Sequence, residues 1–466
     1  MNCPYCGSSV PERMEECPFC GAPLPYSPPG PALRVSSPSP APKRRKPLPA
    51  WVSFLLILAL CAAAYGIVSL VFGSVPEPLT PAFQQSTGSA SGKASEQDVP
   101  SVPILRHDDD ADRAALSETY LRAEEIIPSL SMRYYLTQLD ADALSAACLL
   151  YEAASDFSEG CLMPSGISED TLFNVFFLLE FDCPELLQVS FADGVSYTYD
   201  EASGEVLDVA LTYRMTQDQY TEAYNECRRV IDDLCAQAQY LSDGEKERLV
   251  FDHITQNCIY SLNARYADSA YGALVRGRAK CDGITYAATW LFQEMGLRCL
   301  SVAGYPTDGT VGHAWNLVEI DGRFYGLDIT ADVPQPFEEL PVLYQAYNVP
   351  NSLILGSSEL DESILWCGEL PETGSMEESY YVLQGRYIPT GSDYSELLSE
   401  LMDEAYYETG WFSVQFESET EIDALFDGFD AVVDGWLDAA GADTAEYSCW
   451  TCEGYNVFYA EFSPTQ

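Results

Sequence analysis

The chain has 466 residues, more than one ordinary domain holds, so its length predicts three or more structural units. It carries 23 basic and 72 acidic residues, and residues 51–466 alone hold 17 basic and 69 acidic ones, a net charge of about −52. An exterior so acidic excludes nucleic acid and anionic polymers as tight partners and favours a well-solvated surface.

Residues 1–24 contain two matched pairs of cysteines. Cys3 and Cys6 lie in "CPYCG", Cys17 and Cys20 lie in "CPFCG", and ten residues separate the pairs. The glycine after each second cysteine can take the left-handed conformation of a tight knuckle, and each proline presets the backbone. Four thiolates at this spacing predict a structural tetrahedral zinc site in a zinc ribbon, with disulfide bonds as the alternative.

A membrane helix is predicted after the ribbon. Residues 25–50 are rich in Pro and Ser, which is typical of an unstructured linker, and they include the basic cluster Lys43–Lys46. Residues 51–73 contain no charged side chain, and at a rise of 1.5 Å per residue they can span a hydrocarbon core of about 30 Å. A cleaved signal peptide is the alternative, but the apolar stretch is long for one and follows about fifty residues that have their own metal site.

Two independent features predict the orientation of this helix. The basic cluster flanks its amino side, and such clusters stay cytoplasmic. Zinc-binding thiolates also need the reducing cytosol. We therefore expect a single-pass protein of the cell membrane with a cytoplasmic amino end and an extracellular carboxyl end. Residues 74–111, rich in Pro, Ser and Gly, are expected to form a flexible stalk.

Residues 112–240 are expected to form an accessory α+β domain. Helical patterns cover residues 112–127, 143–154 and 219–238, and strand patterns cover residues 186–200 and 204–214. Nothing in this region carries chemistry that can be named. A role in positioning or regulating the unit that follows is compatible with its pattern.

Cys281 is the candidate nucleophile. It lies between the polar start of "RGRAKCDG" and the apolar, helix-compatible residues 284–295, so a loop is expected to meet a helix there. The unpaired N–H groups and the positive end of a helix dipole favour a thiolate at that position. Lys280 adds a positive charge, whereas Asp282 opposes it.

A predicted hairpin brings one of the chain's three histidines next to a carboxylate. The strand-like runs "HAWNLVEI" and "RFYGLDIT" flank Asp321–Gly322, a strong signal for a two-residue turn. In that register His313 opposes Thr330, and Asp328 is a diagonal neighbour of His313 on the same face. A bulge of one residue would move Asp328 to the other face.

Cys281, His313 and Asp328 have the residue types of a catalytic triad. A thiolate attacks a carbonyl carbon, a histidine transfers the proton, and a carboxylate orients the histidine. The alternative interpretation is a small buried cysteine and a structural histidine.

Over about residues 245–332 the chain resembles the transglutaminase-like superfamily, in the form found in bacterial surface and membrane proteins. The segments "GALVRGRAKCDG", "MGLRCLSVAG" and "GHAWNLVEIDGRFYGLDIT" carry the resemblance, and "FDHITQNCIYS" resembles the family's first helix. The resemblance implies a papain-like α+β core over residues 241–350 and acyl transfer through a thioester on Cys281. It also implies His313 as the base, Asp328 as the orienting acid, and no cofactor for catalysis.

Several positions depart from the family pattern. An aromatic residue that often follows the Cys-x-Gly step is Ile284 here, and a Trp that often follows the Asp-x-Thr step is Ala331. The family's usual histidine in the first helix falls on Phe251, while His253 is displaced from it and is expected to be a structural or surface residue. These changes affect the expected shape of the substrate cleft. The backbone N–H of Cys281 is the candidate oxyanion donor.

Residues 351–466 are expected to form a second accessory α+β domain, because a strand pattern, a long helical pattern and another strand pattern follow in order. "LPETG" at residues 370–374 matches a sortase sorting signal, but no hydrophobic span follows it, so we interpret it as a coincidence. Cys449 and Cys452 are interpreted as packed thiols or a local disulfide bond. Cys227–Cys235 is excluded as a disulfide bond if one helix holds both residues, because eight residues then separate them by about 12 Å.

The sequence as a whole predicts an α+β protein with a transglutaminase-like core, flanking α+β domains, a zinc ribbon and one membrane helix. Its expected function is that of an extracellular cysteine acyltransferase or peptidase acting on a protein or peptide. Attack by an amine on the thioester would cross-link, attack by water would hydrolyse, and the sequence leaves both open. The alternative is a non-catalytic binding or sensing module at the cell surface, whose zinc ribbon meets a cytoplasmic protein partner.

Overall fold

The computed structural model describes residues 113, 115–191, 195–306, 312–334, 341–356, 358–360, 370–440, 444–452 and 454–463. Within this part of the chain, no helix is long and apolar enough to cross a membrane, and no group of three or more His, Cys, Asp or Glu side chains could hold a metal ion. The predicted zinc ligands and the predicted membrane helix over residues 51–73 lie outside the described residues.

The first sheet is antiparallel, and its strand order is β1-β3-β2. Its strands are β1 (Gly160–Leu162), β2 (Val195–Tyr199) and β3 (Val206–Leu211). Two buried helices accompany the sheet, α4 (Ala141–Ser155) and α5 (Glu169–Asp182). They begin after Asp140 and Ser168, whose side chains accept the backbone N–H three residues further on and so satisfy a free donor of the first turn. The predicted helix over residues 143–154 lies within α4.

The prediction of one helix over residues 112–127 is wrong. The described part of this segment holds only short pieces, among them η1 (Thr119–Arg122) and α3 (Ala123–Ile126). The hydroxyl of Ser145 on α4 accepts the backbone N–H of Tyr120 at 3.0 Å. A tertiary side-chain contact thus takes a backbone group that a continuous helix would use, and the chain bends onto α4. The short turns η2 (Leu130–Met132) and η3 (Leu136–Gln138) follow.

The middle of the chain combines helices with a five-stranded antiparallel sheet of strand order β10-β6-β7-β8-β9. The strands are β6 (Cys299–Pro306), β7 (His313–Ile320), β8 (Arg323–Leu327), β9 (Tyr347–Val349) and β10 (Ser358–Leu360). The helices are α6 (Gln217–Ala238), α7 (Asp243–Asn257), α8 (Ala270–Leu274), α9 (Cys281–Glu294) and α10 (Asn351–Leu355). The short strands β4 (Ile259–Tyr260) and β5 (Arg278–Ala279) pair in parallel.

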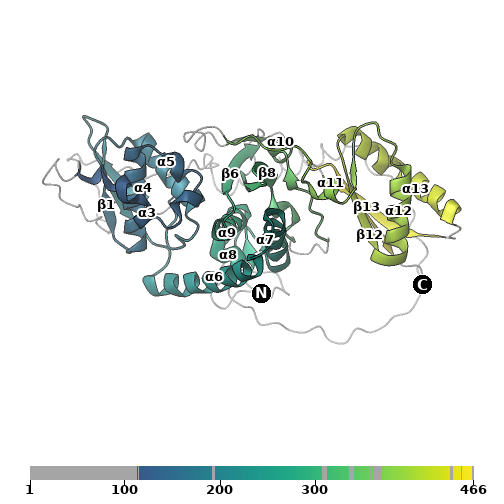
Figure 1. Ribbon diagram of the computed structural model, residues 1–466, viewed down its shortest axis with the longest axis horizontal. Coiled ribbons are helices and arrows are strands. Elements are labelled where there is room, and N and C mark those ends of the chain that lie inside the picture. The colour runs from purple at the N-terminus through teal and green to yellow at the C-terminus, as the bar shows by residue number, and fades with distance from the viewer. Residues whose placement is uncertain are drawn as a thin grey trace, which may run out of the picture. The chain divides into compact units, whose positions relative to one another are not determined.

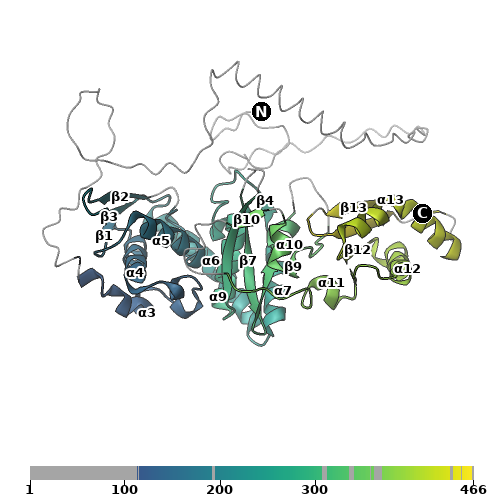
Figure 2. The ribbon, with the colours of Figure 1, turned by 90° about the horizontal axis from the view of Figure 1, so that it is seen from above.

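Helix α9 is the central element of this region. It packs against β6 and β7 on one side and against α6, α7 and α8 on the other, and nearly all of its residues are buried. Figure 1 shows α7, α8 and α9 gathered beside β6 and β8, and Figure 2 shows α7 and α9 beside β7. An almost wholly apolar helix suits such a position, because no face of it meets water.

The predicted hairpin is present from its turn to the end of β8. Asp321 and Gly322 have φ angles of 50° and 84°, as a primed two-residue turn requires. The strands pair in the predicted register as far as Leu327. One detail is wrong: Thr330 does not oppose His313, because β8 ends at Leu327 and the turn η4 (Ile329–Asp332) replaces the strand. His313 pairs instead with Gly304 of β6.

The carboxyl-terminal part has its own four-stranded sheet, ordered β11-β12-β14-β13. Its strands are β11 (Tyr387–Ile388), β12 (Trp411–Phe416), β13 (Glu446–Cys452) and β14 (Val457–Ser463). Its helices are α11 (Tyr380–Leu383), α12 (Ser395–Glu404) and α13 (Glu419–Ala440), and a π-helical turn, η6 (Ala405–Thr409), follows α12. The apolar residues of β12, β14, α12 and α13 form one buried cluster, which includes Phe412, Phe429, Trp436 and Phe458.

The minor motifs of the sequence have structural roles. Thr373 and Gly374 of "LPETG" run beside β8, where the N–H of Gly374 donates to the carbonyl of Phe324 at 2.7 Å. Cys449 and Cys452 are both free and, three residues apart on β13, point to opposite faces of the sheet. The interpretation of a local disulfide bond is therefore wrong.

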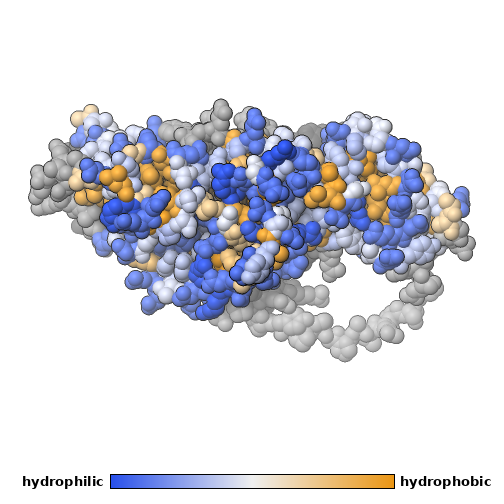
Figure 3. All heavy atoms as spheres, in the orientation of Figure 1, coloured by the Kyte–Doolittle hydropathy of each residue, from blue (hydrophilic) through white to orange (hydrophobic). Residues whose placement is uncertain are grey.

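Hydrophilic residues predominate on the face of the molecule drawn in Figure 3, and apolar residues form separate patches on it. The described residues form a mixed α+β structure, which confirms the α+β part of the predicted fold class. The predicted boundaries of the individual domains stay predictions.

Candidate active site

Cys281 is the first residue of α9. The helix begins at Cys281 because the backbone of Lys280, the residue before it, is extended. The thiol of Cys281 donates to Oδ1 of Asp282 at 3.3 Å, and Lys280 forms an ion pair with Oδ2 of Asp282 at 2.7 Å. The cysteine is buried, with 6% of its surface exposed. The thiol of Cys281 therefore lies next to the free N–H groups of the first turn and the positive end of the helix dipole. Little solvent reaches it.

Gly283, the third residue of "CDG", lets the start of α9 approach its neighbours closely. A Cβ atom at this position would lie 2.2 Å from the carbonyl oxygen of Ala267, a distance that no side chain tolerates. The N–H of Lys280 donates to the same carbonyl at 2.9 Å. The glycine is thus needed to anchor the residue before Cys281 to the loop ahead of α8.

Asn316 fixes β7 against α9. Its side-chain amide is fully buried and donates to the carbonyl of Thr285 at 3.2 Å and to the hydroxyl of Thr289 at 2.9 Å, both on α9. Because β7 also carries His313, these bonds fix the position of His313 along α9 relative to Cys281. Such buried polar bonds favour one register of strand against helix over others.

The predicted contact between His313 and Asp328 is present. Nε2 of His313 lies 2.7 Å from Oδ2 of Asp328. Cys281 lies close enough to His313 for its side chain to help raise the pKa of the imidazole. The imidazole therefore contacts the carboxylate and lies near the thiol, and the side chain of His313 is 34% exposed, against 2% for Asp328.

The charge of this pair follows from its surroundings. The negative charge of Asp328 raises the pKa of His313 to about 11; burial acts against this shift, and the hydrogen bonds to Asp328 and Cys281 support it. Burial raises the pKa of Asp328, but the charge of His313 and the hydrogen bonds from His313 and Tyr455 outweigh burial and lower it. Asp328 thus favours the protonated, cationic form of His313.

Trp315 supports the imidazole from the same face of β7. Its ring stacks on that of His313 with centroids 5.9 Å apart, and its Nε1 donates to Oδ1 of Asn351 at 2.7 Å. Residues two apart on a strand share a face, so "HAW" itself predicts that these two rings are neighbours. The packing limits rotation of the imidazole ring.

Two residues near the site were not identified from the sequence. The hydroxyl of Tyr455, in the turn between β13 and β14, donates to Oδ2 of Asp328 at 2.6 Å. Tyr260, on β4, lies close enough to Cys281 and Asp328 for their charges to add to the effect of burial, and its pKa is raised. No local pattern marks Tyr455, because 127 residues separate it from Asp328.

Packing explains the departure from the family pattern in the first helix. Phe251 is fully buried on α7 and stacks on Tyr344, with ring centroids 4.9 Å apart. His253, on the same helix, is half-buried, and burial lowers its pKa. Phe251 is thus a core residue of the helix that covers this side of the site.

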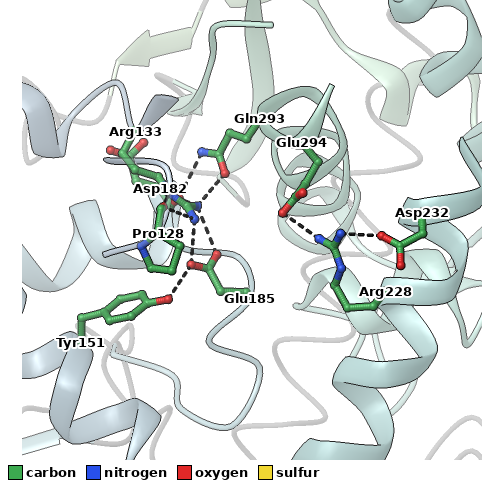
Figure 4. A network of polar contacts seen from close by, with 9 residues as sticks. All are labelled: Pro128, Arg133, Tyr151, Asp182, Glu185, Arg228, Asp232, Gln293 and Glu294. Carbon is green, nitrogen blue, oxygen red and sulfur yellow. Dashed lines mark hydrogen bonds and ion pairs between the residues drawn. The ribbon is translucent and has the colours of Figure 1, made fainter. Parts of the chain in front are cut away.

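Figure 4 shows how the far end of α9 is held. Gln293 accepts from Arg133 at 2.6 Å and donates to the carbonyl of Asp182 at 3.1 Å. Glu294 forms an ion pair of 2.7 Å with Arg228 of α6. The amino-terminal part of the chain therefore restrains the helix that begins with Cys281.

Residues 228–329 match the family model of the transglutaminase-like superfamily. This range contains Cys281, His313 and Asp328, and it forms a transglutaminase-like domain. No curated protein matches the chain.

Three solved structures are similar to the chain at low identity. One is described as a TGase, with 14% identity, a TM-score of 0.23, and coverage of 43% of this chain and 55% of that one. A candidate cysteine protease from Cytophaga hutchinsonii has 15% identity and a TM-score of 0.18, and the match covers 29% of this chain and 61% of that one. A candidate protease from Parabacteroides distasonis has 9% identity and a TM-score of 0.21, with coverage of 57% and 61%. The chain thus spans less than two thirds of each of these proteins.

Proposed function

We propose that this protein is a membrane-anchored extracellular cysteine acyltransferase or peptidase that acts through a thioester on Cys281. One observation supports the proposal above all others. Nε2 of His313 lies 2.7 Å from the carboxylate of Asp328, and the imidazole is close enough to Cys281, the first residue of a helix, for the cysteine to help raise its pKa. A nucleophile, a base and an orienting acid in this order are the requirements of acyl transfer.

In the first half of the reaction, the sulfur of Cys281 attacks the carbonyl carbon of an amide. The proton of the thiol passes to His313, whose raised pKa favours the imidazolium. As the C–N bond breaks, the imidazolium gives this proton to the leaving amine, and a thioester remains on Cys281. The backbone N–H of Cys281 is the proposed donor to the oxyanion.

In the second half, His313 removes a proton from the incoming nucleophile. Attack by water releases a carboxylic acid and regenerates the thiol, and the reaction is hydrolysis. Attack by a primary amine forms a new amide, and the reaction is cross-linking. Asp328 holds the imidazole in both halves and stabilises its positive charge.

The segments outside the described residues complete the proposal. Cys3, Cys6, Cys17 and Cys20 supply four thiolates, the donor set of a structural zinc site. Residues 51–73 would anchor the chain in the cell membrane, and a protein or peptide outside the cell would be the substrate. The zinc ribbon would meet a protein partner in the cytoplasm.

A non-catalytic binding module is the second candidate function, and one observation favours it. The carboxylate of Asp282 accepts the thiol proton of Cys281 at 3.3 Å, and its negative charge opposes a thiolate. The ion pair of 2.7 Å between Lys280 and Asp282 offsets part of this charge. The two candidates differ in the reactivity of Cys281.

Alkylation of the full-length protein with iodoacetamide tests the choice. The labelling rate of each cysteine is measured by peptide mass spectrometry at about pH 7. Cys235 and Cys449 are internal controls, because both are more exposed than Cys281 and burial raises the pKa of both. We expect Cys281 to react at least about tenfold faster than either control.

His313→Ala supplies the matched variant. It should bring the labelling rate of Cys281 down to that of the control cysteines and leave their rates unchanged. If wild-type Cys281 reacts no faster than Cys235 and Cys449, the enzyme proposal fails and the binding module replaces it.

A further inference from the structure

Tyr455 reaches the proposed catalytic carboxylate from the carboxyl-terminal sheet. Its hydroxyl lies 2.6 Å from Oδ2 of Asp328, and the same oxygen accepts from His313 at 2.7 Å. Two donors from opposite parts of the sequence thus converge on one carboxylate oxygen. The contact joins the turn between β13 and β14 to the end of β8.

The carboxylate needs such donors. The side chain of Asp328 is 2% exposed, so burial acts to raise its pKa and to neutralise it. The hydrogen bond from Tyr455 counters this effect together with the charge of His313. A neutral Asp328 would no longer stabilise an imidazolium.

The surroundings of Tyr455 favour its protonated, donating form. Burial, the charge of Asp328 and the hydrogen bond between them raise the pKa of Tyr455 well above its usual value. A protonated phenol beside an ionised carboxylate forms a charge-assisted hydrogen bond, which is stronger than a neutral one. Because it is directional, it restricts rotation of the carboxylate as well as stabilising its charge.

Buried polar contacts hold the turn of Tyr455 in place. The side-chain amide of Gln415, on β12, donates to the carbonyl of Tyr455 at 2.9 Å and to the carbonyl of Gln345 at 3.2 Å. The N–H of Gln345 in turn donates to Oδ2 of Asp332 at 3.0 Å. Gln415 therefore binds both the turn of Tyr455 and the segment that Asp332 fixes next to Asp328.

We propose that Tyr455 is a positioning residue that orients the carboxylate of Asp328 toward His313, so that the carboxyl-terminal sheet completes the active site. This inference rests on the proposed function. Tyr455 touches neither substrate nor sulfur in this role and acts through Asp328. Loss of its hydroxyl frees the carboxylate to rotate away from the imidazole, which lowers the pKa of His313 and the share of thiolate at Cys281.

The test uses the full chain and iodoacetamide labelling of Cys281 at two pH values. At about pH 6 the thiolate depends on the imidazolium, whereas at about pH 10 a thiol ionises without it. For Tyr455→Phe we expect labelling about tenfold to a hundredfold slower than wild type at the lower pH and unchanged at the higher pH, which corresponds to the loss of one hydrogen bond to a charged group.

Tyr381→Phe is the matched control. Tyr381 also donates a buried hydroxyl between the two parts of the chain, to the carbonyl of Leu343 at 2.7 Å, but its bond does not involve Asp328. It should label at the wild-type rate at both pH values. An equal loss in Tyr381→Phe and Tyr455→Phe would show that only docking of the sheet matters, and the inference would be overturned.

The double variant Asp328→Asn with Tyr455→Phe tests the route of the effect. If Tyr455 acts through Asp328, the double variant should label no more slowly at about pH 6 than Asp328→Asn alone, because effects through one shared partner do not add. A further loss as large as that of Tyr455→Phe by itself would contradict the inference.

A second measurement does not depend on the reactivity of Cys281. The chain has only three histidines, so the titration of His313 can be followed by nuclear magnetic resonance and assigned with His313→Ala. Tyr455→Phe should lower the pKa of His313, and Tyr381→Phe should not. An unchanged or higher pKa in Tyr455→Phe would overturn the positioning role, whereas slow labelling of wild-type Cys281 would overturn only the proposed function.

Discussion

At the scale of single residues, the pKa values of two buried carboxyl groups of this domain shift in opposite directions. Asp328 meets a cationic partner and stays charged, as its lowered pKa indicates. Glu247, on α7, is fully buried and accepts from the side-chain amide of Asn348 at 2.7 Å. Burial raises the pKa of Glu247 to about 8, and the hydrogen bonds from Asn348 and Tyr347 reduce this shift only in part. The difference is the presence or absence of a neighbouring cation.

Glu247 should therefore make stability depend on pH. Its pKa is raised in the folded state, so its contribution is fully present below about 4.5 and is lost as the pH rises through about 8. Glu247→Gln keeps a neutral amide that can still accept from Asn348. We expect it to leave the free energy of unfolding unchanged near pH 5 and to raise it by roughly 1 to 3 kcal/mol near pH 9.

Urea unfolding of the full chain at both pH values checks this prediction. Glu222→Gln is the matched control, because Glu222 is an exposed glutamate on α6. It should change the free energy of unfolding little at either pH. A gain near pH 9 that Glu222→Gln reproduces would mean that general charge reduction, and not burial of Glu247, is the cause.

The local part of the site could be predicted from the sequence, whereas its distant part could not. A two-residue turn fixes the register of a hairpin, and register fixes which side chains share a face, so His313 and Asp328 follow from Asp321–Gly322. The end of β8 did not follow, because the turn η4 depends on tertiary contacts of Asp332. Tyr455 reaches the site only through packing of a separate sheet, which no periodicity encodes.

At the scale of elements, α9 is positioned from both ends. Its first residues meet the loop before α8, and Asn316 binds its middle from β7. Its last residues contact Arg133 and Arg228 (Figure 4). Arg133 is buried, donates to Glu185 at 2.8 Å and 3.1 Å, and also contacts the carbonyl of Asp182.

Breaking this buried ion pair should be costly. Arg133→Met leaves the carboxylate of Glu185 buried without its cation, although the hydroxyl of Tyr151 still donates to it at 3.1 Å (Figure 4). We expect a loss of about 3 to 5 kcal/mol in the free energy of unfolding, measured by urea denaturation. The double variant Arg133→Met with Glu185→Leu should recover part of the loss, because it removes the orphaned charge.

Arg122→Met is the control for this prediction. Arg122 pairs with Glu125 at 3.3 Å, but both side chains are more than half exposed, at 62% and 74%. Removing this pair should cost less than about 1 kcal/mol. Similar losses for Arg122→Met and Arg133→Met would show that the buried network contributes no more than a surface pair.

Helices and strands with a clear hydrophobic period in the sequence were predicted better than those whose ends depend on tertiary contacts. The expected helix over residues 219–238 lies within α6, and the strands expected over residues 186–200 and 204–214 contain β2 and β3. The prediction of one helix over residues 112–127 was wrong because the backbone N–H of Tyr120 donates to Ser145 of α4 and not to a helical carbonyl. Helix α5 (Glu169–Asp182) was missed, because buried residues cover it all round and leave no amphipathic period.

At the scale of the whole molecule, charge and hydropathy divide the sequence at residues 51–73. Residues 1–50 carry six basic and three acidic side chains, and all later residues together carry a large acidic excess. The hydrophilic face in Figure 3 agrees with an exterior that stays well solvated. The uncharged span next to a basic cluster supports the proposed single-pass membrane anchor.

The orientation of this span can be tested with two epitope tags, one before Cys3 and one after Gln466. The basic cluster Lys43–Lys46 lies on the amino side of residues 51–73, and moving such a cluster across a membrane is unfavourable. An impermeant protease added to intact cells should therefore remove the carboxyl-terminal tag and spare the amino-terminal one, and permeabilised cells should lose both. Replacing Lys43–Lys46 by glutamines should weaken this preference and leave a fraction of chains inverted. Protection of the carboxyl-terminal tag in intact wild-type cells would contradict the proposed extracellular location. It would also contradict the proposal that Cys281 acts on a protein outside the cell.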